Sequence, residues 1–279
     1  VYQKYMNVLV IIGNHPRNLG LLEKLSKEKD ITIRGLILFK REDMIPNPPI
    51  YLDNKVKKLW KIHFQKRYNS EKKFFNSDNS IINDISNKIV IDNEKKFYSL
   101  EVMNFVKNFK FQACFITGIP IIKEPLLSLL PANTVNLHLG LIPNYKGAVT
   151  MFWPFYFLEP TMAGTTYHII DKYVDTGEIL HNNVPVLKKG DGIHDVACKA
   201  ILAAHKDIPK VIKEIKKRLK HKIKPKKDYS LRHKGKLFRK VDWKPEMLDL
   251  IYNVFNDKIV DLYLKKKINC KKPKIIKLK

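Results

Sequence analysis

The order of apolar runs near the N-terminus restricts the fold more than any other feature of this sequence. A run of strand length, Asn7 to Ile12, is followed by a polar loop, Gly13 to Asn18, and by helical apolar spacing from Leu19 to Lys27. A second apolar run, Ile31 to Phe39, completes a strand–loop–helix–strand unit. Because strands joined through a helix lie parallel, we predict an α/β fold with a Rossmann-like, doubly wound and mostly parallel sheet. No GxGxxG motif is present, so a dinucleotide site is not supported.

The remaining pattern predicts one main domain with two additions. Further strands are predicted at 88–92, 112–117, 134–138, 165–170 and 179–186, and helices at 100–108, 148–158 and 191–206. The irregular region at about 40–87 is interpreted as a helical insertion packed on the core. The main domain is therefore predicted to cover residues 1–205. Residues 206–279 are predicted to form a small, basic and mainly helical C-terminal extension.

The net charge of +26 is concentrated in that extension, where 26 Lys and Arg face 8 Asp and Glu. A basic surface of this kind is typical of polyanion binding. Lysine supplies most of the charge, however, and arginine is the better phosphate ligand, so we favour a solvated lysine face and expect no nucleic-acid partner. No run of about 18 uncharged apolar residues is present, so no membrane span is expected. Three scattered cysteines favour a cytoplasmic protein without a thiolate zinc site, and we expect no metal.

Three polar residues form the strongest chemical signal in the chain. Asn136 and His138 are two positions apart on a predicted strand, so their side chains leave the same face. Asp175 lies in a turn-forming Asp-Thr-Gly sequence. An amide that donates to an oxyanion, an imidazole that moves or stabilises charge, and a carboxylate that orients the imidazole are suited to acyl transfer to nitrogen. Ordinary hydrogen bonding in a buried core is the alternative explanation.

The surrounding sequence resembles the folate-dependent formyltransferases. The resemblance rests on Asn136-Leu-His-Leu-Gly-Leu-Ile-Pro-Asn-Tyr-Lys-Gly147 and on Gly164-Thr-Thr-Tyr-His-Ile-Ile-Asp-Lys-Tyr-Val-Asp-Thr-Gly177, and it covers about residues 7–205. Gly140 replaces a serine that is common in the family. The resemblance implies N-formylation of a primary amine from the cosubstrate 10-formyltetrahydrofolate. It also implies that Asn136 and His138 stabilise the oxyanion while Asp175 holds His138 and assists proton transfer.

The same resemblance suggests which residues bind the folate. The segment from Thr117 to Ile122 corresponds to the pterin-pocket segment, and the loop around Ile170 and Asp171 to the opposite wall. His168 matches a histidine near the folate in some members. The predicted folate contacts are Thr117, Gly118, Ile119, Pro120, Ile121, Ile122, His168, Ile170 and Asp171. A strand-to-helix turn without a ligand also explains the first segment, and a structural role also explains His168.

The amine acceptor is predicted to contact two loops. Gly13, Asn14, Arg17 and Asn18 belong to the loop that corresponds to the amine-substrate loop, where amides at a helix start and Arg17 suit a phosphate. Asn18 is equally well explained as the helix N-cap. Tyr145 and Lys146 belong to the second loop.

The insertion and the second loop resemble nucleotide-sugar N-formyltransferases most closely. We therefore expect the acceptor to be an amino sugar, linked to a nucleotide and used for surface polysaccharide. A methionyl-tRNA formyltransferase with a reduced C-terminus, or an inactive enzyme that binds nucleic acid, are the alternatives. The apolar segment from Ile251 to Leu264 suggests a homodimer contact.

Overall fold

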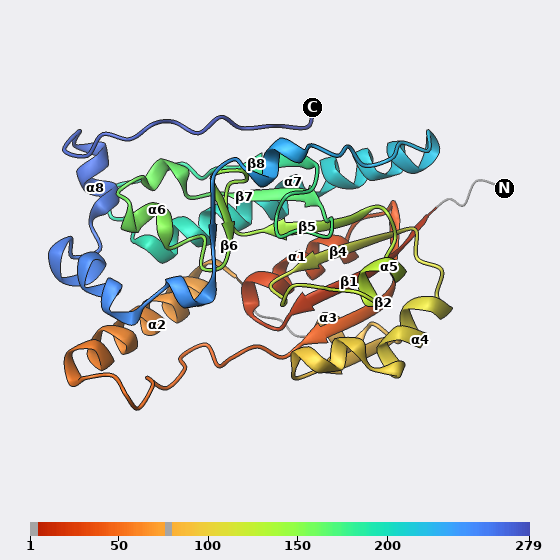
Figure 1. Cartoon of the computed structure of the whole chain (residues 1–279), viewed down its shortest axis with the longest axis horizontal. Helices are drawn as coiled ribbons and strands as arrows, with labels where there is room; N and C mark the ends of the chain where they lie inside the picture. Colours follow the sequence, from red (N-terminus) through yellow and green to blue (C-terminus); the bar gives the residue numbers. More distant parts are fainter. Residues whose placement is uncertain (1–4, 76–79) are drawn as a thin grey trace.

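The computed structural model describes residues 5–75 and 80–279, and its centre is a seven-stranded sheet (Figure 1). The sheet order is β3-β2-β1-β4-β5-β7-β8. Strands β3 to β5 are parallel, and β7 is antiparallel to both neighbours, which confirms the predicted α/β class. The strands are β1 (Met6–Gly13), β2 (Ile31–Phe39), β3 (Lys88–Ile91), β4 (Ala113–Thr117), β5 (Thr134–His138), β7 (Thr165–Ile169) and β8 (Ile179–Asn183); β6 (Tyr145–Gly147) and β9 (Lys236–Phe238) form a separate ribbon.

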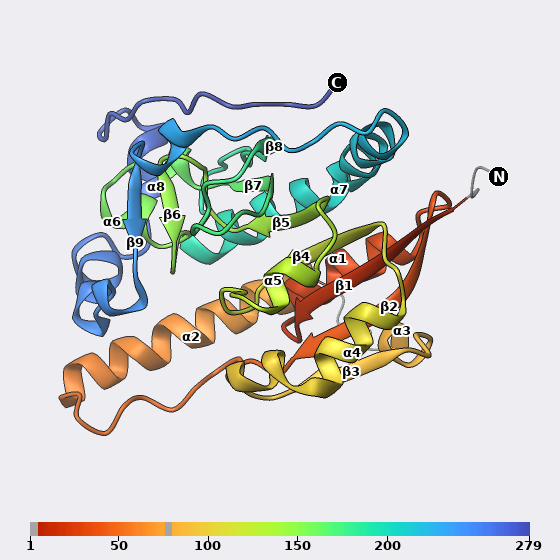
Figure 2. The ribbon, with the colours of Figure 1, turned by 45° about the vertical axis from the view of Figure 1, so that its right-hand side comes forward.

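Helices cover both faces of the sheet (Figure 2). They are α1 (Pro16–Ser26), α2 (Asn54–Phe74), α3 (Ser80–Asn83), α4 (Leu100–Asn108), α5 (Leu126–Leu129), α6 (Trp153–Tyr156), α7 (Ile193–Lys220) and α8 (Ile259–Leu264). Val8, Val10 and Ile12 of β1 pack with α1 and α7, whereas Leu9 and Ile11 pack on the other face with α4 and α5. Burial on both faces explains why β1 is continuously apolar.

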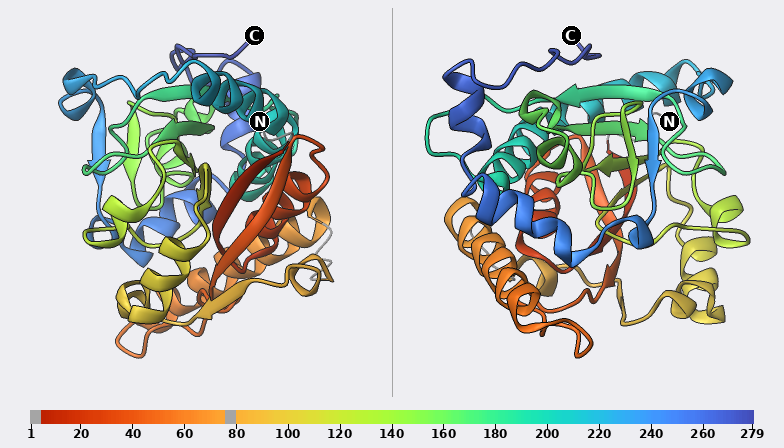
Figure 3. Two further views of the ribbon diagram at one scale, coloured as in Figure 1. Left: turned by 90° about the vertical axis from the view of Figure 1, so that its right-hand side faces the viewer. Right: turned by 60° about the vertical axis from the view of Figure 1, so that its left-hand side comes forward.

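The predicted insertion contains the long helix α2, which packs against α7 (Figure 3). The helix begins after Asp53, whose side chain accepts a hydrogen bond from the Val56 N–H at 2.8 Å. Such a cap satisfies one of the free amide groups at a helix start. Residues 76–79 of the predicted insertion lie outside the described residues.

The prediction of a helix at 148–158 is wrong over most of that range. Only α6 is helical, because Val149 and Leu158 both have a φ of 57°, which is incompatible with an α-helix. The aromatic side chains of this segment instead pack into a second core between α2, α6 and α8.

Helix α7 is much longer than predicted, and the predicted division at residue 205 falls inside it. The buried stripe continues through Ile208, Val211, Ile212 and Ile215, and this packing carries the helix past Pro209. Beyond α7 the described chain is not mainly helical. It forms short turns, β9 and the short helix α8, and residues 271–279 run extended beside β8. There the Asn182 N–H donates to the Ile276 carbonyl at 2.7 Å, so this segment covers the edge of the sheet (Figure 1).

The apolar segment that suggested a dimer contact is packed inside the chain. Ile251, Ile259 and Val260 are buried in the second core, so their side chains are not available to a partner. A homodimer therefore stays a prediction. Within residues 5–75 and 80–279, no helix is both long and apolar enough to cross a membrane.

Candidate active site

Strand β5 presents Asn136 and His138 on one face, as their spacing predicts. Their neighbours Val135 and Leu137 point into the core on the opposite face. The Thr117 hydroxyl donates to the Leu137 carbonyl at 3.1 Å and ties the end of β4 to β5. The alternation of a strand thus places an amide and an imidazole together at the carboxyl edge of the sheet.

Asp175 reaches this face from the turn between β7 and β8. A Cβ at Gly177 would lie 1.8 Å from the Ile169 carbonyl oxygen, so only glycine lets the turn close against β7. Asp175 Oδ2 lies 3.4 Å from His138 Nδ1, and Oδ1 lies 3.4 Å from His168 Nε2. The structure therefore brings the predicted amide, imidazole and acid together with His168. We call Asn136, His138, His168 and Asp175 the His138 cluster.

The hydrogen bonds of His138 define which ring nitrogen carries the proton. Nε2 lies 2.9 Å from the Tyr145 carbonyl oxygen, which can only accept, so Nε2 is the protonated nitrogen. Burial lowers the pKa of His138 below its usual value and outweighs the opposing charge of Asp175, so the ring is neutral near pH 7. A Cβ at Gly140 would lie 2.6 Å from both His138 Nε2 and the Tyr145 oxygen, so glycine permits this contact. Nδ1 is left as a proton acceptor facing the carboxylate.

Asp175 is ionised in this environment. Burial by itself raises the pKa of its carboxyl group. The two histidines and the Gly147 N–H, which donates to Oδ2 at 2.7 Å, outweigh burial and hold the pKa well below the usual range. The buried carboxylate therefore stabilises any positive charge that develops on the His138 ring.

His168 belongs to this cluster, although the sequence placed it beside the folate. It lies opposite Asn136 in the antiparallel pairing of β5 and β7. Its Nδ1 lies 3.2 Å from the Ile169 carbonyl oxygen, and its Nε2 faces both Asn136 Nδ2 at 3.1 Å and Asp175 Oδ1 at 3.4 Å. One N–H of the Asn136 amide is therefore fixed by His168, and the second is left to donate to a ligand.

The C-terminal extension supports the cluster through the ribbon of β6 and β9. The backbone of β6 supplies both the Tyr145 carbonyl to His138 and the Gly147 N–H to Asp175. Strand β9 pairs with β6, and Lys146 Nζ donates to the Leu231 carbonyl at 2.7 Å. Tyr145 and Lys146, predicted to bind the acceptor, are thus buried residues that fix the β6 backbone. The sequence did not indicate this role of β9, because three-residue strands carry little periodicity.

The predicted pterin segment divides into buried and exposed residues. Thr117 is buried, Ile119 and Ile122 pack beside the core under α4 and α5, and Ile121 is exposed. A hollow of about 260 Å³ lies between α5 and the start of β5. Of the predicted folate residues, only Ile170 and Asp171 line it. An apolar wall beside a polar loop suits a flat heteroaromatic ring.

The loop after β1 lies at the same edge but is occupied by protein contacts. Asn14 Oδ1 accepts from the Arg41 N–H at 2.8 Å. The N-cap of α1 is His15, so the alternative that Asn18 is the cap is wrong. Asn18 lies within the helix and turns its amide toward Gly118, where a Cβ would be 2.3 Å from Asn18 Nδ2. A Cβ at Gly13 would lie 2.5 Å from the Gly118 carbonyl oxygen, so the two glycines let these loops approach closely.

Three arginines converge beside this loop, and we call Arg17, Arg41 and Arg67 the arginine cluster. Arg41 Nη1 donates to the Gly118 carbonyl at 2.8 Å, and Arg17 pairs with the buried Glu71. Burial and the charge of Arg17 lower the pKa of Arg67 to about 10. The sequence missed Arg41 and Arg67, although the position of Arg41 just after β2 places it at the ligand edge of a parallel sheet.

Buried polar atoms without partners concentrate around the arginine cluster. Within residues 5–75 and 80–279, six such atoms lie there: His15 Nδ1, Arg17 Nε, Asn18 Nδ2, Arg41 Nε, Arg67 Nε and Glu71 Oε2. Buried donors are normally paired, so unpaired ones need an explanation. Five of the six are nitrogens, and four of these belong to cationic or amide groups that donate, which is the composition of an anion site. In the same described ranges, no group of three metal-binding side chains comes together.

The His138 cluster lies in a part of the chain that is similar to a known protein family. Residues 90–212, which include all four members of the cluster, match the family model described as formyl transferase. Methionyl-tRNA formyltransferases from Azobacteroides pseudotrichonymphae and Solibacter usitatus are 26% identical over 114 residues and 33% identical over 81 residues. These regions are 40% and 29% of this chain and 35% and 26% of the relatives. The chain thus spans about a third of the length of these relatives.

Solved structures share the fold at low sequence identity. Glycinamide ribonucleotide transformylase 1 from Symbiobacterium toebii has a TM-score of 0.53 and 15% identity, covering 78% of this chain and 92% of that one. The sugar 3N-formyl transferase WlaRD has a TM-score of 0.53 and 18% identity, and the match covers 87% of this chain and 72% of WlaRD. A 4-N formyltransferase from Francisella tularensis has a TM-score of 0.51 and 19% identity, and the match covers 86% of this chain and 79% of that one. Residues 90–212, which carry Asn136, His138 and Asp175, are therefore similar to the formyl transferase family, and these solved formyltransferases share the fold of the chain.

Proposed function

We propose that this protein transfers the formyl group of 10-formyltetrahydrofolate to the primary amine of a nucleotide-linked amino sugar. The observation that carries the proposal is the His138 cluster: a free amide N–H, a neutral imidazole and an ionised carboxylate meet at the ligand edge of the sheet. The sugar is destined for a surface polysaccharide, and the reaction takes place in the cytoplasm.

In the proposed reaction each group of the His138 cluster has its own task. The amine nitrogen attacks the formyl carbon, and the carbonyl oxygen becomes an oxyanion that accepts from the second Asn136 N–H. The amine loses a proton to His138 Nδ1, where Asp175 stabilises the imidazolium that forms. The carbon–nitrogen bond to the folate then breaks, and the departing folate nitrogen receives the proton. Atoms and charges therefore balance without a further reactant.

The arginine cluster supports an acceptor that carries phosphate. Guanidinium groups bind phosphate oxygens in forked pairs, and three of them lie at the edge that also holds Asn136. The WlaRD structure was determined in the presence of dTDP and 5-N-formyl-tetrahydrofolate, and that protein is a sugar formyltransferase. A nucleotide diphosphate held by Arg41 and its neighbours would carry its sugar amine toward the formyl carbon.

Methionyl-tRNA is the second candidate acceptor. The two relatives compared above are methionyl-tRNA formyltransferases, and the lysine-rich segment after residue 205 is suited to a phosphate backbone. An enzyme acting on tRNA would bind RNA with an affinity that falls steeply as salt rises, whereas a nucleotide-sugar enzyme would not need such binding.

The experiment is a turnover screen of the purified protein with 10-formyltetrahydrofolate. The acceptors are a panel of dTDP-, UDP- and GDP-linked amino sugars and, in a separate arm, methionyl-tRNA. Mass spectrometry follows the gain of one carbonyl group. We expect transfer to a nucleotide-linked amino sugar, and its loss by about a hundredfold or more in Asn136→Ala. The matched control Asn69→Ala, at an exposed position of α2, should retain full turnover. Transfer to methionyl-tRNA alone, or to no amine, would overturn the proposal.

A further inference from the structure

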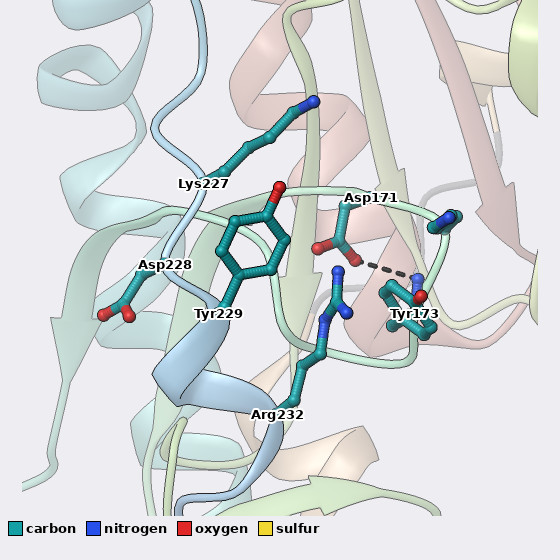
Figure 4. Close-up of a pocket in the computed structure, with 7 residues that line it drawn as sticks. Asp171, Tyr173, Lys227, Asp228, Tyr229 and Arg232 are labelled. Atoms are coloured by element: carbon teal, nitrogen blue, oxygen red, sulfur yellow. Dashed lines mark hydrogen bonds between the residues drawn. The ribbon is translucent and has the colours of Figure 1, made fainter.

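The C-terminal extension reaches the main domain at two further places. One is a cavity of about 420 Å³, where the Arg232 guanidinium stacks on the ring of Tyr173 in the loop after β7 (Figure 4). The other is the outer side of β8, the last strand of the sheet, along which residues 271–279 run (Figure 1). We call residues 271–279 the edge segment. Its contacts lead from the edge of the sheet toward the His138 cluster.

Asn182 of β8 binds the edge segment through both its backbone and its side chain. The Asn182 N–H donates to the Ile276 carbonyl at 2.7 Å, and Asn182 Oδ1 accepts from the Ile276 N–H at 2.9 Å. The Leu278 N–H adds a third bond, to His181 Nδ1 at 2.9 Å, and the Leu278 side chain packs against the main core. The edge segment is therefore held at defined atoms of β8 and covers a strand that would otherwise be an open edge.

The Ile276 N–H fixes the orientation of the Asn182 amide, because an N–H can only donate. Oδ1 faces the edge segment, so Nδ2 faces the interior, where it donates to the Thr166 hydroxyl at 2.9 Å. Thr166 of β7 lies opposite Asn182 in the pairing with β8 and opposite His138 in the pairing with β5. A buried amide with both ends engaged thus connects the edge segment to the strand beside His138.

The Thr166 hydroxyl extends this connection to the loop that follows β5. It donates to the Gly140 carbonyl at 2.7 Å and accepts from the Ile142 N–H at 3.0 Å. With the bond from Asn182, the one donor and both acceptor positions of this hydroxyl are used. The position of the loop therefore depends on a hydroxyl that is itself held by Asn182.

The loop from Gly140 to Ile142 in turn holds the backbone partner of His138. The Leu141 carbonyl accepts from the Tyr145 N–H at 2.8 Å, and the Tyr145 carbonyl contacts His138 Nε2 at 2.9 Å. A shift of this loop moves the Tyr145 carbonyl and, with it, the ring that takes up the amine proton in the proposed reaction. Small displacements of groups that act on a transition state lower turnover strongly.

We propose that the edge segment positions His138 for proton transfer and that Asn182 is the positioning residue that connects the two. The inference rests on the proposed function, because it takes His138 as the proton acceptor. Asn182 acts through Thr166 and the loop after β5, and not on the reacting atoms. The expected signature is a loss of kcat without a matching change in KM, because the orientation of the ring affects turnover more than it affects binding of the acceptor.

Point variants of the full chain break the connection at different atoms. Ile276→Pro removes the N–H that Asn182 Oδ1 accepts, and Asn182→Leu removes the amide at nearly constant volume. The matched control Ile275→Pro introduces the same residue one position away and leaves both backbone groups of Ile276 in place. The readouts are kcat and KM with the acceptor found in the turnover screen, and hydrogen exchange of the Ile142 amide, which needs no acceptor.

We expect Ile276→Pro and Asn182→Leu each to lower kcat about tenfold while KM stays within about twofold. The double variant should be no slower than Asn182→Leu alone, because both changes break the same connection. Exchange of the Ile142 amide should be about tenfold faster in these variants. Ile275→Pro should resemble the wild type in all three quantities.

An unchanged kcat in Ile276→Pro would overturn the proposal. A double variant that shows the product of the two single losses would overturn it as well, because the edge segment would then act independently of Asn182. Equal losses in Ile275→Pro would assign the effect to a general loosening of the edge and would have the same consequence. If Asn182→Leu did not fold, as thermal unfolding would show, the comparison of Ile276→Pro with Ile275→Pro would decide.

Hydrogen exchange separates this inference from the proposed function. If the wild type transferred the formyl group to no amine, the proposed function would fail, and the exchange of the Ile142 amide would still report on the connection. Faster exchange in Ile276→Pro, but not in Ile275→Pro, would support the connection between the edge segment and the loop. Unchanged exchange in both variants would overturn it.

Discussion

The His138 cluster and the arginine cluster lie at the same edge of the sheet but differ in how many of their polar atoms have partners within the protein. In the first, each functional side chain contacts another member or the backbone of β6. In the second, six buried polar atoms within the described ranges lack a partner. The difference indicates two tasks. Groups that stabilise a transition state act best when they are fixed beforehand, whereas unpaired donors are suited to a ligand that supplies the missing acceptors.

Replacing the acid of the His138 cluster should have the largest effect. Asp175→Asn keeps an acceptor for the Gly147 N–H but removes the charge that stabilises a protonated His138. We expect kcat to fall on the order of a thousandfold while the folded structure is retained. Steady-state kinetics and circular dichroism measure the two quantities. Asp84→Asn, at an exposed aspartate, should behave as wild type, whereas a loss below tenfold in Asp175→Asn would contradict this assignment.

Removing the buried hydrogen bonds of Lys146 that hold β6 in place should have an intermediate effect on turnover. Lys146→Met leaves the Leu231 and Arg232 carbonyls without their buried donor and loosens the strand that contacts His138 and Asp175. We expect the free energy of unfolding to fall by about 2 kcal/mol and kcat to fall by about thirtyfold, with little change in KM. Chemical denaturation and kinetics test both. Lys236→Met, on the exposed side of β9, is the control, and a change in KM alone would show that Lys146 contacts substrate instead.

A change in the arginine cluster should affect binding and not turnover. Arg41→Gln removes one guanidinium from the edge beside Gly118. We expect KM for a phosphate-bearing acceptor to rise about tenfold while kcat stays within about twofold. Arg34→Gln provides the matched control. If kcat fell and KM did not, the two clusters would not have the separate tasks that their contacts indicate.

The smallest expected effect is that of pH near neutrality. Burial lowers the pKa of His138 below 6.5, so the neutral ring that accepts a proton predominates above that pH. At saturating acceptor, kcat should change by less than about twofold between pH 8 and 6.5 and fall at lower pH. The same shift reduces stability as pH falls below 6.5, because the unfolded chain takes up the proton first. NMR of the ring nitrogens of His138 measures its pKa directly. A pKa above 6.5 would contradict the expected effect of burial.

The sequence predicted the His138 cluster well because its members are local and periodic. The two-residue spacing of Asn136 and His138 fixes a face, and Gly177 fixes the turn that delivers Asp175. The support from β9 and Lys146 was not predictable, because it joins residues about 90 positions apart through backbone atoms that any sequence has. Arg67 was missed for a similar reason: only the packing of α2 brings it beside Arg17. The length of α7 was underestimated because the apolar stripe continues past Pro209.

A crystal structure with 5-formyltetrahydrofolate and dTDP tests the central comparison most directly. We expect the phosphates to contact Arg17, Arg41 or Arg67. We expect the formyl group to lie beside Asn136, while the contacts of His138 with Tyr145 and Asp175 stay unchanged. Phosphates bound away from the arginine cluster, or a His138 cluster that rearranges to receive the formyl group, would contradict it.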